Sequence, residues 1–197
     1  NFTIPVFLGN VFQQLYSMAD AVIVGKFVGT KGLAAVGATG TITFLIIGFL
    51  MGVTTGVTVL TSQKFGAGRM DEMRKTVGNA AILSAVIAVV MTAVSMLGMH
   101  RLLVFMHTPE DIFDGAYGYI MIICAGIFTQ VLYNLVSSIL RALGNSKTPL
   151  YFLILAAGLN IVLDLVFIIF FHWGAPGAAW ATVISQGVSG VLCLIYM

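Results

Sequence analysis

Charged residues are scarce in this chain. Only 8% of its 197 residues are Asp, Glu, Lys or Arg, whereas a soluble domain carries about 25%. Hydrophobic residues make up 59% of the chain, and the mean hydropathy is +1.06. The net charge is only +2 and there is no basic tract, so we expect no nucleic-acid partner. The composition predicts an integral membrane protein and excludes an ordinary soluble domain.

Cysteine and histidine are also rare. The two cysteines, Cys124 and Cys193, lie in separate apolar runs, where we expect them to be small buried hydrophobic side chains. The three histidines lie outside the long apolar runs, and no Cys/His spacing resembles that of a zinc site. We therefore expect no disulfide, no structural metal, no cofactor and no enzymatic activity.

Long apolar runs are abundant. A bilayer crossing takes about 20 apolar residues in a helix, and these runs are continuous and do not alternate as the strands of a membrane barrel would. Six runs are long enough: approximately 4–25, 35–62, 76–99, 109–140, 149–171 and 176–197. The sequence predicts an all-α integral membrane protein built as a bundle of six transmembrane helices.

The basic residues between the runs indicate the orientation. The connections after the second and fourth runs carry six: Lys64, Arg69, Arg74, Lys75, Arg141 and Lys147. The connections after the other runs carry three, so the first group is expected to face the cytoplasm, together with both chain ends. We predict a short amphipathic cytoplasmic helix over 66–75. Because the last run ends at Met197 without a polar flank and the chain has no initiator Met, we expect it to be part of a longer protein.

An acidic residue stands inside the fifth run. Asp164 follows Asn160 by four residues, so the two side chains share a face of a helix. An Asp at the centre of a membrane helix costs about 2.5 to 3.5 kcal/mol on insertion scales, so it is expected to have a partner, a proton or a cation. The alternative is that Asp164 lies near a helix end or pairs with a base, although nearly all Lys and Arg lie outside the runs. Together the two residues resemble half of an ion-binding site.

Other runs carry polar residues at helical spacing. In the first run, Gln13, Tyr16, Ser17 and Asp20 share a face, and Asp20 is the only other acid well inside an apolar run. In the fourth run, Gln130 and Asn134 either join helices by hydrogen bonds or line a cavity. In the sixth run, Ala178 and Thr182 lie on one face. We take Gln13, Tyr16, Gln130 and Asn134 as candidate substrate-cavity residues.

Several segments, taken together, resemble the amino-terminal half of transporters of the MATE (multidrug and toxic compound extrusion) family. They are 15–20 (LYSMAD), 33–37 (LAAVG), 62–68 (SQKFGAG), 141–149 (RALGNSKTP), 159–164 (LNIVLD) and 177–182 (GAAWAT). The resemblance covers the whole chain and implies one six-helix lobe of a twelve-helix, two-lobe protein of the cell membrane. The second lobe is not in this chain, and it is expected as a partner together with membrane lipid.

The resemblance also implies a function. Members of the family export organic, often cationic drugs in exchange for inward Na⁺ or H⁺, and in several of them the amino-terminal lobe binds the coupling cation. The matching positions here are Asp20, Asn160, Asp164 and Thr182, with Ala178 as a possible source of a backbone oxygen. Two carboxylates sharing a dry site repel each other, so at least one is expected to hold a proton or cation near neutral pH.

Three other functions compete with this one. A lipid or lipid-linked oligosaccharide flippase of the same superfamily is expected to line its cavity with several Arg or Lys, and here Arg141 is the only basic candidate. An intramembrane aspartyl protease is expected to carry Tyr-Asp and Gly-x-Gly-Asp, but Ala19 precedes Asp20 and Leu163 precedes Asp164. A passive channel is expected to show a repeated pore loop or a ring of charges, and the sequence has neither.

Overall fold

The chain folds into helices in a computed structural model that describes residues 3–197, with side chains described from Phe7 onward except for Asn10. No strand occurs within that range. The elements are α1 (Thr3–Phe27), α2 (Thr30–Gly66), α3 (Met70–Phe105), α4 (Glu110–Ala125), α5 (Ile127–Ala142), α6 (Lys147–Asp164), the π-helix η1 (Leu165–Phe170) and α7 (Gly174–Tyr196). The all-helical prediction is confirmed.

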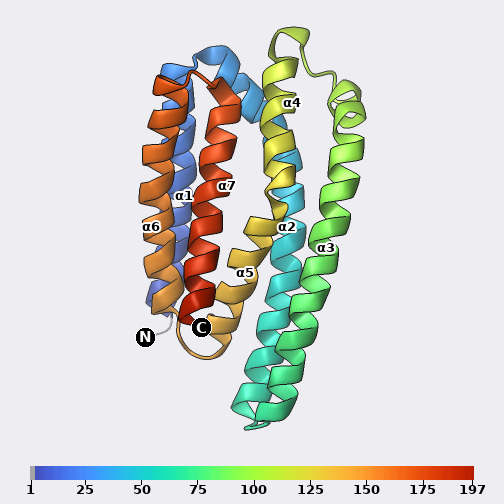
Figure 1. Cartoon of the computed structure of the whole chain (residues 1–197), viewed down its shortest axis with the longest axis vertical. Helices are drawn as coiled ribbons and strands as arrows, with labels where there is room; N and C mark the ends of the chain where they lie inside the picture. Colours follow the sequence, from blue (N-terminus) through green and yellow to red (C-terminus); the bar gives the residue numbers. More distant parts are fainter. Residues whose placement is uncertain (1–2) are drawn as a thin grey trace.

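The helices form six long rods when α4 is joined to α5 and α6 to η1 (Figure 1). Helix α7 packs against α4, α5 and α6, while α2 packs against α3, α4 and α5. Helix α1 lies mainly along α6 and touches α2 much less. This packing leaves a loosely closed seam between α1 and α2, and Gln13, Gln14 and Ser17 of α1 line a cavity along it.

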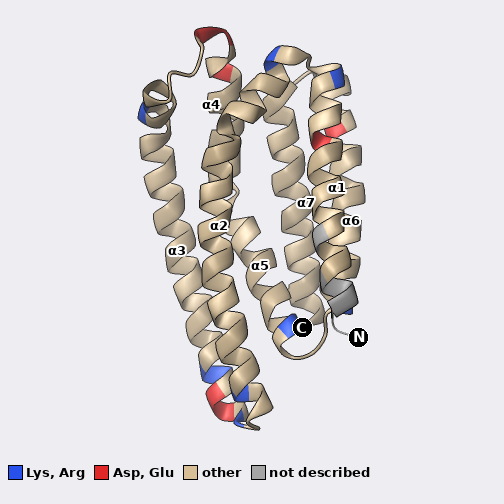
Figure 2. Cartoon of the chain, turned by 180° about the vertical axis from the view of Figure 1, so that it is seen from behind, with Lys and Arg blue, Asp and Glu red and all other residues tan. Residues whose placement is uncertain are grey.

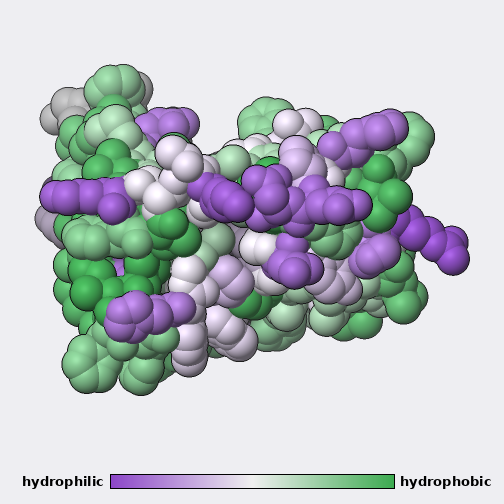
Figure 3. All heavy atoms as spheres, turned by 90° about the horizontal axis from the view of Figure 1, so that it is seen from above, coloured by the Kyte–Doolittle hydropathy of each residue, from purple (hydrophilic) through white to green (hydrophobic). Residues whose placement is uncertain are grey.

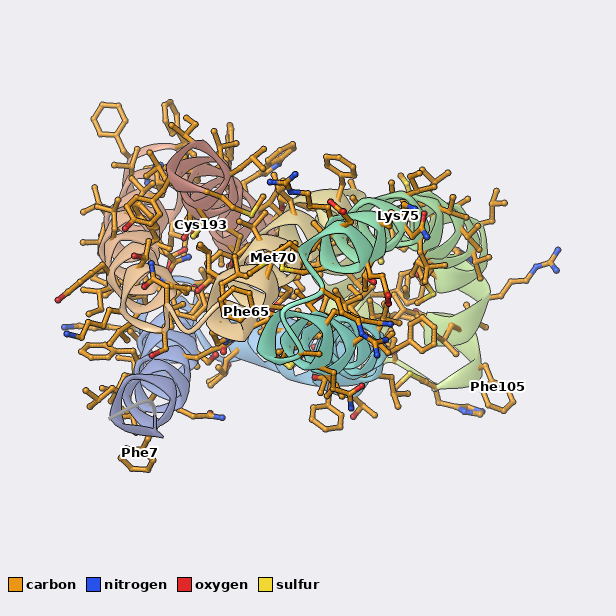
Figure 4. The ribbon with its side chains drawn as sticks, turned by 90° about the horizontal axis from the view of Figure 1, so that it is seen from below. Phe7, Phe65, Met70, Lys75, Phe105 and Cys193 are labelled. Carbon is orange, nitrogen blue, oxygen red and sulfur yellow. The ribbon has the colours of Figure 1, made fainter. Side chains whose placement is uncertain are left out.

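The outer surface is suited to lipid. Four rods have the length and composition of membrane spans, namely α2, α3, α6 with η1, and α7, and the bent pair α4–α5 makes a fifth. Helix α1 has 25 residues, but Gln13, Gln14 and Asp20 make it less apolar. Phe7 and Phe105 point away from the bundle and are 64% and 79% exposed (Figure 4). Seen from above, hydrophilic residues cross the middle of the end face, and green hydrophobic ones lie on both sides of this band (Figure 3).

The connection between α2 and α3 differs from the sequence prediction. Residues 66–75 do not form a separate amphipathic helix, because α3 begins at Met70 and continues without a break to Phe105. The turn between the helices is only three residues long, and Gly68 within it has a φ of +71°, which side chains rarely adopt. A tight turn of this kind lets two long helices run antiparallel, with the Asp and Glu of the segment in the first turn of α3.

Charged residues gather at the two ends of the bundle (Figure 2). At the α2–α3 turn, Glu72 accepts a hydrogen bond from Lys64 and pairs with Arg69 at 3.7 Å. The hydrogen bond from Lys64 and the two positive charges lower the pKa of Glu72. At the other end, Lys31 of α2 pairs with Asp111 of α4 at 3.6 Å. These exposed pairs stabilise a solvated surface only weakly.

The fourth predicted run is broken in the middle. We expected one span over 109–140, but the helix ends at Ala125 and resumes at Ile127 with a bend of 46°. Gly126 at the break lies against Val183 of α7, and a Cβ there would come within 2.9 Å of Cγ1 and 3.1 Å of Cβ of Val183. Only glycine allows this close approach at the bend, after which α5 packs against α7.

The fifth run changes its helix type at Asp164. The α-helix ends at this residue, and the same rod continues as a π-helix to Phe170. A π-helical turn is rare and often marks a functional position. Asp164 is therefore the last residue of α6 but lies inside a continuous rod that extends from Lys147 to Phe170. No base among the described side chains forms an ion pair with it.

Candidate cation site

Asp164 and Asn160 are fully buried on the same face of α6. Both have 0% exposure, and that face is turned towards α7. The Asn160 side-chain amide donates a hydrogen bond to the hydroxyl of Thr182 on α7, at the long distance of 3.5 Å. The spacing of four residues read from the sequence thus places an acid and an amide side by side, with a hydroxyl opposite them.

Asp20 of α1 completes the acidic part of the site. Its carboxyl group lies close enough to that of Asp164 for a hydrogen bond between them if one of the two is protonated. With both ionised, Asp20 Oδ1 and both carboxyl oxygens of Asp164 have no hydrogen-bond partner among the described side chains. Two ionised carboxylates this close to each other repel.

Two tyrosines surround the acids. The Tyr16 hydroxyl lies near Thr182 and both carboxyl groups, and Tyr119 of α4 is near both acids as well. Tyr16 stood among the cavity candidates, whereas sequence reasoning did not single out Tyr119. A lone Tyr in an apolar run gives little signal, and only the packing of α4 against α7 brings its hydroxyl to the site.

The site presents several oxygen atoms without partners. Besides the carboxyl oxygens, the buried Asn160 Oδ1 and Tyr16 Oη form no hydrogen bond within the described part of the chain. Each such buried atom costs about 1 to 3 kcal/mol when nothing binds it. Carboxylate, amide and hydroxyl oxygens are the ligands that hard cations prefer. No group of three or more His, Cys, Asp and Glu that could hold a metal occurs among the described residues.

Ala178 lies one turn before Thr182 on α7. It is fully buried, and it belongs to a core cluster with Ala116 and Tyr119 of α4. Its carbonyl belongs to the continuous helix Gly174–Tyr196. The residue allows α4 and α7 to approach closely, and in a helix its carbonyl points along the axis towards Thr182, four residues later.

Three adjoining cavities follow the seam between α1 and α2. One of about 210 Å³ is lined by Tyr16, Asp20, Tyr119, Gln130 and Thr182. The next, of about 700 Å³, shares Tyr119 with it and reaches Gln13 and Met51. The third, of about 300 Å³, shares Gln13 and Met51 and reaches Asn134 and Arg141. All four cavity candidates from the sequence therefore line this path, and the cation candidates lie at one end of it.

The fold and the site define a helical, multi-pass membrane protein. Its oxygen-rich acidic site lies beside the row of three adjoining cavities. The MatE family model matches residues 5–166. The chain therefore belongs to the MATE family of multidrug efflux transporters, as the sequence motifs predicted.

Individual relatives agree with this assignment. The chain is 33% identical over 196 residues to the probable multidrug resistance protein YpnP of Bacillus subtilis, covering 100% of this chain and 44% of that protein. It superposes on an outward-facing structure of a MATE family transporter with a TM-score of 0.94 and 29% identity, covering 99% of this chain and 43% of that one. For an inward-facing structure the TM-score is 0.88 at 29% identity, with 93% and 42% covered. The chain thus spans less than half the length of the relatives it matches, in agreement with a single lobe.

Proposed function

We propose that this chain is the amino-terminal lobe of a cation-coupled exporter of organic compounds. The observation that carries the proposal is the meeting of the fully buried Asp164 with the partly buried Asp20, which leaves carboxyl oxygens of both without a hydrogen-bond partner among the described residues. This pair lies beside a path of cavities large enough for small organic molecules. In this proposal, Asp164 is the main cation carrier, Asp20 is the second acid, and Asn160 and Thr182 supply neutral oxygens.

Coupling follows from the way α1 is held. Helix α1 packs mainly on α6 and only loosely on α2, and the acid pair links α1 to α6. A proton or Na⁺ between the carboxyl groups stabilises this link, and its loss leaves two repelling charges. Ion occupancy then shifts the equilibrium between two positions of α1, because an ion that binds one conformation better favours that conformation.

The lining of the cavities supports an organic substrate. The central cavity combines apolar side chains, such as Met51 and Phe44, with the amides of Gln13 and Gln14. A flexible, apolar lining with few charges suits varied organic molecules. The flippase alternative is less well supported, because Arg141 is the only basic residue lining the three cavities. A second six-helix lobe, facing this one across the seam, completes the proposed transporter in the cell membrane.

The proposed orientation can be tested by cysteine labelling. Both native cysteines are fully buried, so they should react little with the reagent. Labelling of an introduced cysteine can then be detected above this low background. In intact cells, a membrane-impermeant maleimide is expected to label Lys31→Cys, between the first two spans, and to label Arg69→Cys only after permeabilisation. The reverse pattern would place the chain ends outside the cell.

Dye efflux from cells carrying the full-length protein tests the function itself. Na⁺ and pH gradients are imposed separately across the membrane. Efflux is expected to rise with an inward gradient of one of the two ions and to stop when that gradient is removed. Efflux that ignores both gradients, or that requires ATP alone, would reject cation coupling.

A further inference from the structure

The cavity at the end of the seam opposite the acid pair contains a guanidinium without a carboxylate. Arg141, in the last turn of α5, is partly buried and lines this cavity of about 300 Å³. Its Nη2 donates to the Ser138 hydroxyl at 3.3 Å. No carboxylate among the described side chains forms an ion pair with it. A half-buried positive charge with four of its five N–H groups still free is suited to an anion.

The start of helix α6 faces the same cavity. Ser146, at the N-cap position, is 8% exposed and lines the cavity, yet its hydroxyl caps no backbone group. Instead, the side chain of Asn145 accepts the backbone N–H of Thr148 at 3.2 Å. The N-terminus of an 18-residue helix carries a partial positive charge. The Ser146 hydroxyl therefore belongs to a mostly buried residue, lines the cavity and has no hydrogen-bond partner in the described structure, beside a positive helix end.

The hydroxyls on the opposite wall have a different role. Thr54, Thr55 and Thr58 of α2 line the cavity, but each donates its proton to a backbone carbonyl within α2. They present lone pairs only and offer no hydrogen bond to an anion. The donors therefore converge from one side, where α5 ends and α6 begins, and the wall formed by α2 is an acceptor surface suited to the hydroxyl or amide groups of a larger molecule.

We propose that this cavity binds an oxyanion, a phosphate or carboxylate group, between Arg141, Ser138, Ser146 and the start of α6. The planar guanidinium suits two oxygens of such a group at once, and the two serine hydroxyls supply further donors. The anion is carried either by a soluble organic molecule or by a phospholipid headgroup. This site lies at the other end of the cavity path from the acid pair, so the lobe binds a cation at one end and an anion at the other.

The proposal can be tested by binding alone, without transport. The full-length protein is placed in nanodiscs of phosphatidylcholine and titrated calorimetrically with inorganic phosphate at constant ionic strength. Choline is the counter-ion, so that the acid pair is not titrated by Na⁺. Phosphate is expected to bind to the wild type. Its affinity is expected to be lower by about tenfold or more for Arg141→Gln and by about threefold for Ser146→Ala. Arg141→Lys keeps the charge without the fork and is expected to be intermediate.

Arg74→Gln is the matched control, because it removes an exposed base from α3 outside the cavity and is expected to bind phosphate as the wild type does. Repeating the titration in nanodiscs with phosphatidylglycerol identifies the source: weaker phosphate binding there indicates a headgroup in the site, and unchanged binding indicates a soluble anion. The proposal would be overturned if the wild type in phosphatidylcholine bound no phosphate, or if Arg141→Gln and Ser146→Ala both bound phosphate as tightly as the wild type.

Discussion

Asp164→Asn is expected to reduce cation-driven efflux to the level of cells without the protein. The amide has nearly the same shape as the carboxyl group and still fits the fully buried position, so the variant should fold and insert. It cannot bind a proton at neutral pH and offers a cation no negative charge. It also removes the repulsion with Asp20, so emptying the site no longer changes the packing of α1 on α6.

The measurement is dye efflux under the gradient that drives the wild type, with protein levels determined on the same membranes. Asp114→Asn is the matched control, because it makes the same chemical change at an exposed position of α4 and should transport like the wild type. Efflux by Asp164→Asn at the wild-type rate would remove the acid pair from the mechanism. Loss of the protein from the membrane would instead show that the carboxyl group is needed for folding.

Gly126→Ala is expected to destabilise the lobe, because the bend leaves no room for an added methyl group beside Val183. The new Cβ would contact Val183 at 2.9 Å from Cγ1 and 3.1 Å from Cβ, and closer still to Cγ2. Val183 is β-branched and has few rotamers available, and its Cβ is too close for a rotation of the side chain to relieve the clash. Overpacking of this kind costs about 1 to 3 kcal/mol. Either the 46° bend opens or α7 moves away from α5.

The check is the thermal unfolding midpoint of the detergent-solubilised protein, followed by size-exclusion chromatography. Gly158→Ala is a control in α6, where a Cβ would meet nothing within 4 Å, and its midpoint should equal or exceed that of the wild type. Adding Val183→Ala to Gly126→Ala should restore most of the lost stability, because it removes both contacting methyl groups. A double variant no more stable than Gly126→Ala would mean that the clash is not the cause.

The sequence carried the fold and the outline of the site. An acid inside an apolar run is costly in a membrane, so Asp164 and Asp20 stood out, and the spacing of Asn160 placed it beside Asp164. The spacing of residues along the chain does not predict how the helices pack against one another. Tyr119 reaches the acids only because α4 lies against α7.

Other features depended on contacts that no single-helix pattern contains. Gly126 is one of 22 glycines, and only the proximity of Val183 distinguishes it as the site of a bend. In the sequence, Arg141 is an ordinary base at a helix end. In the structure, it lines the same cavity as Ser146 at the start of α6. The segment 66–75 has amphipathic composition, but its last six residues join the long helix α3 because helix propagation costs less than a new start.

The central claim is that Asp20 and Asp164 share a proton or exchange it for a cation. Infrared difference spectroscopy of the purified full-length protein tests it most directly. Raising the pH or adding Na⁺ is expected to remove a carboxylic-acid C=O stretching band in the wild type, and this band should be missing from Asp164→Asn under all conditions. A spectrum without any such band, or one that responds identically in Asp164→Asn, would contradict the account.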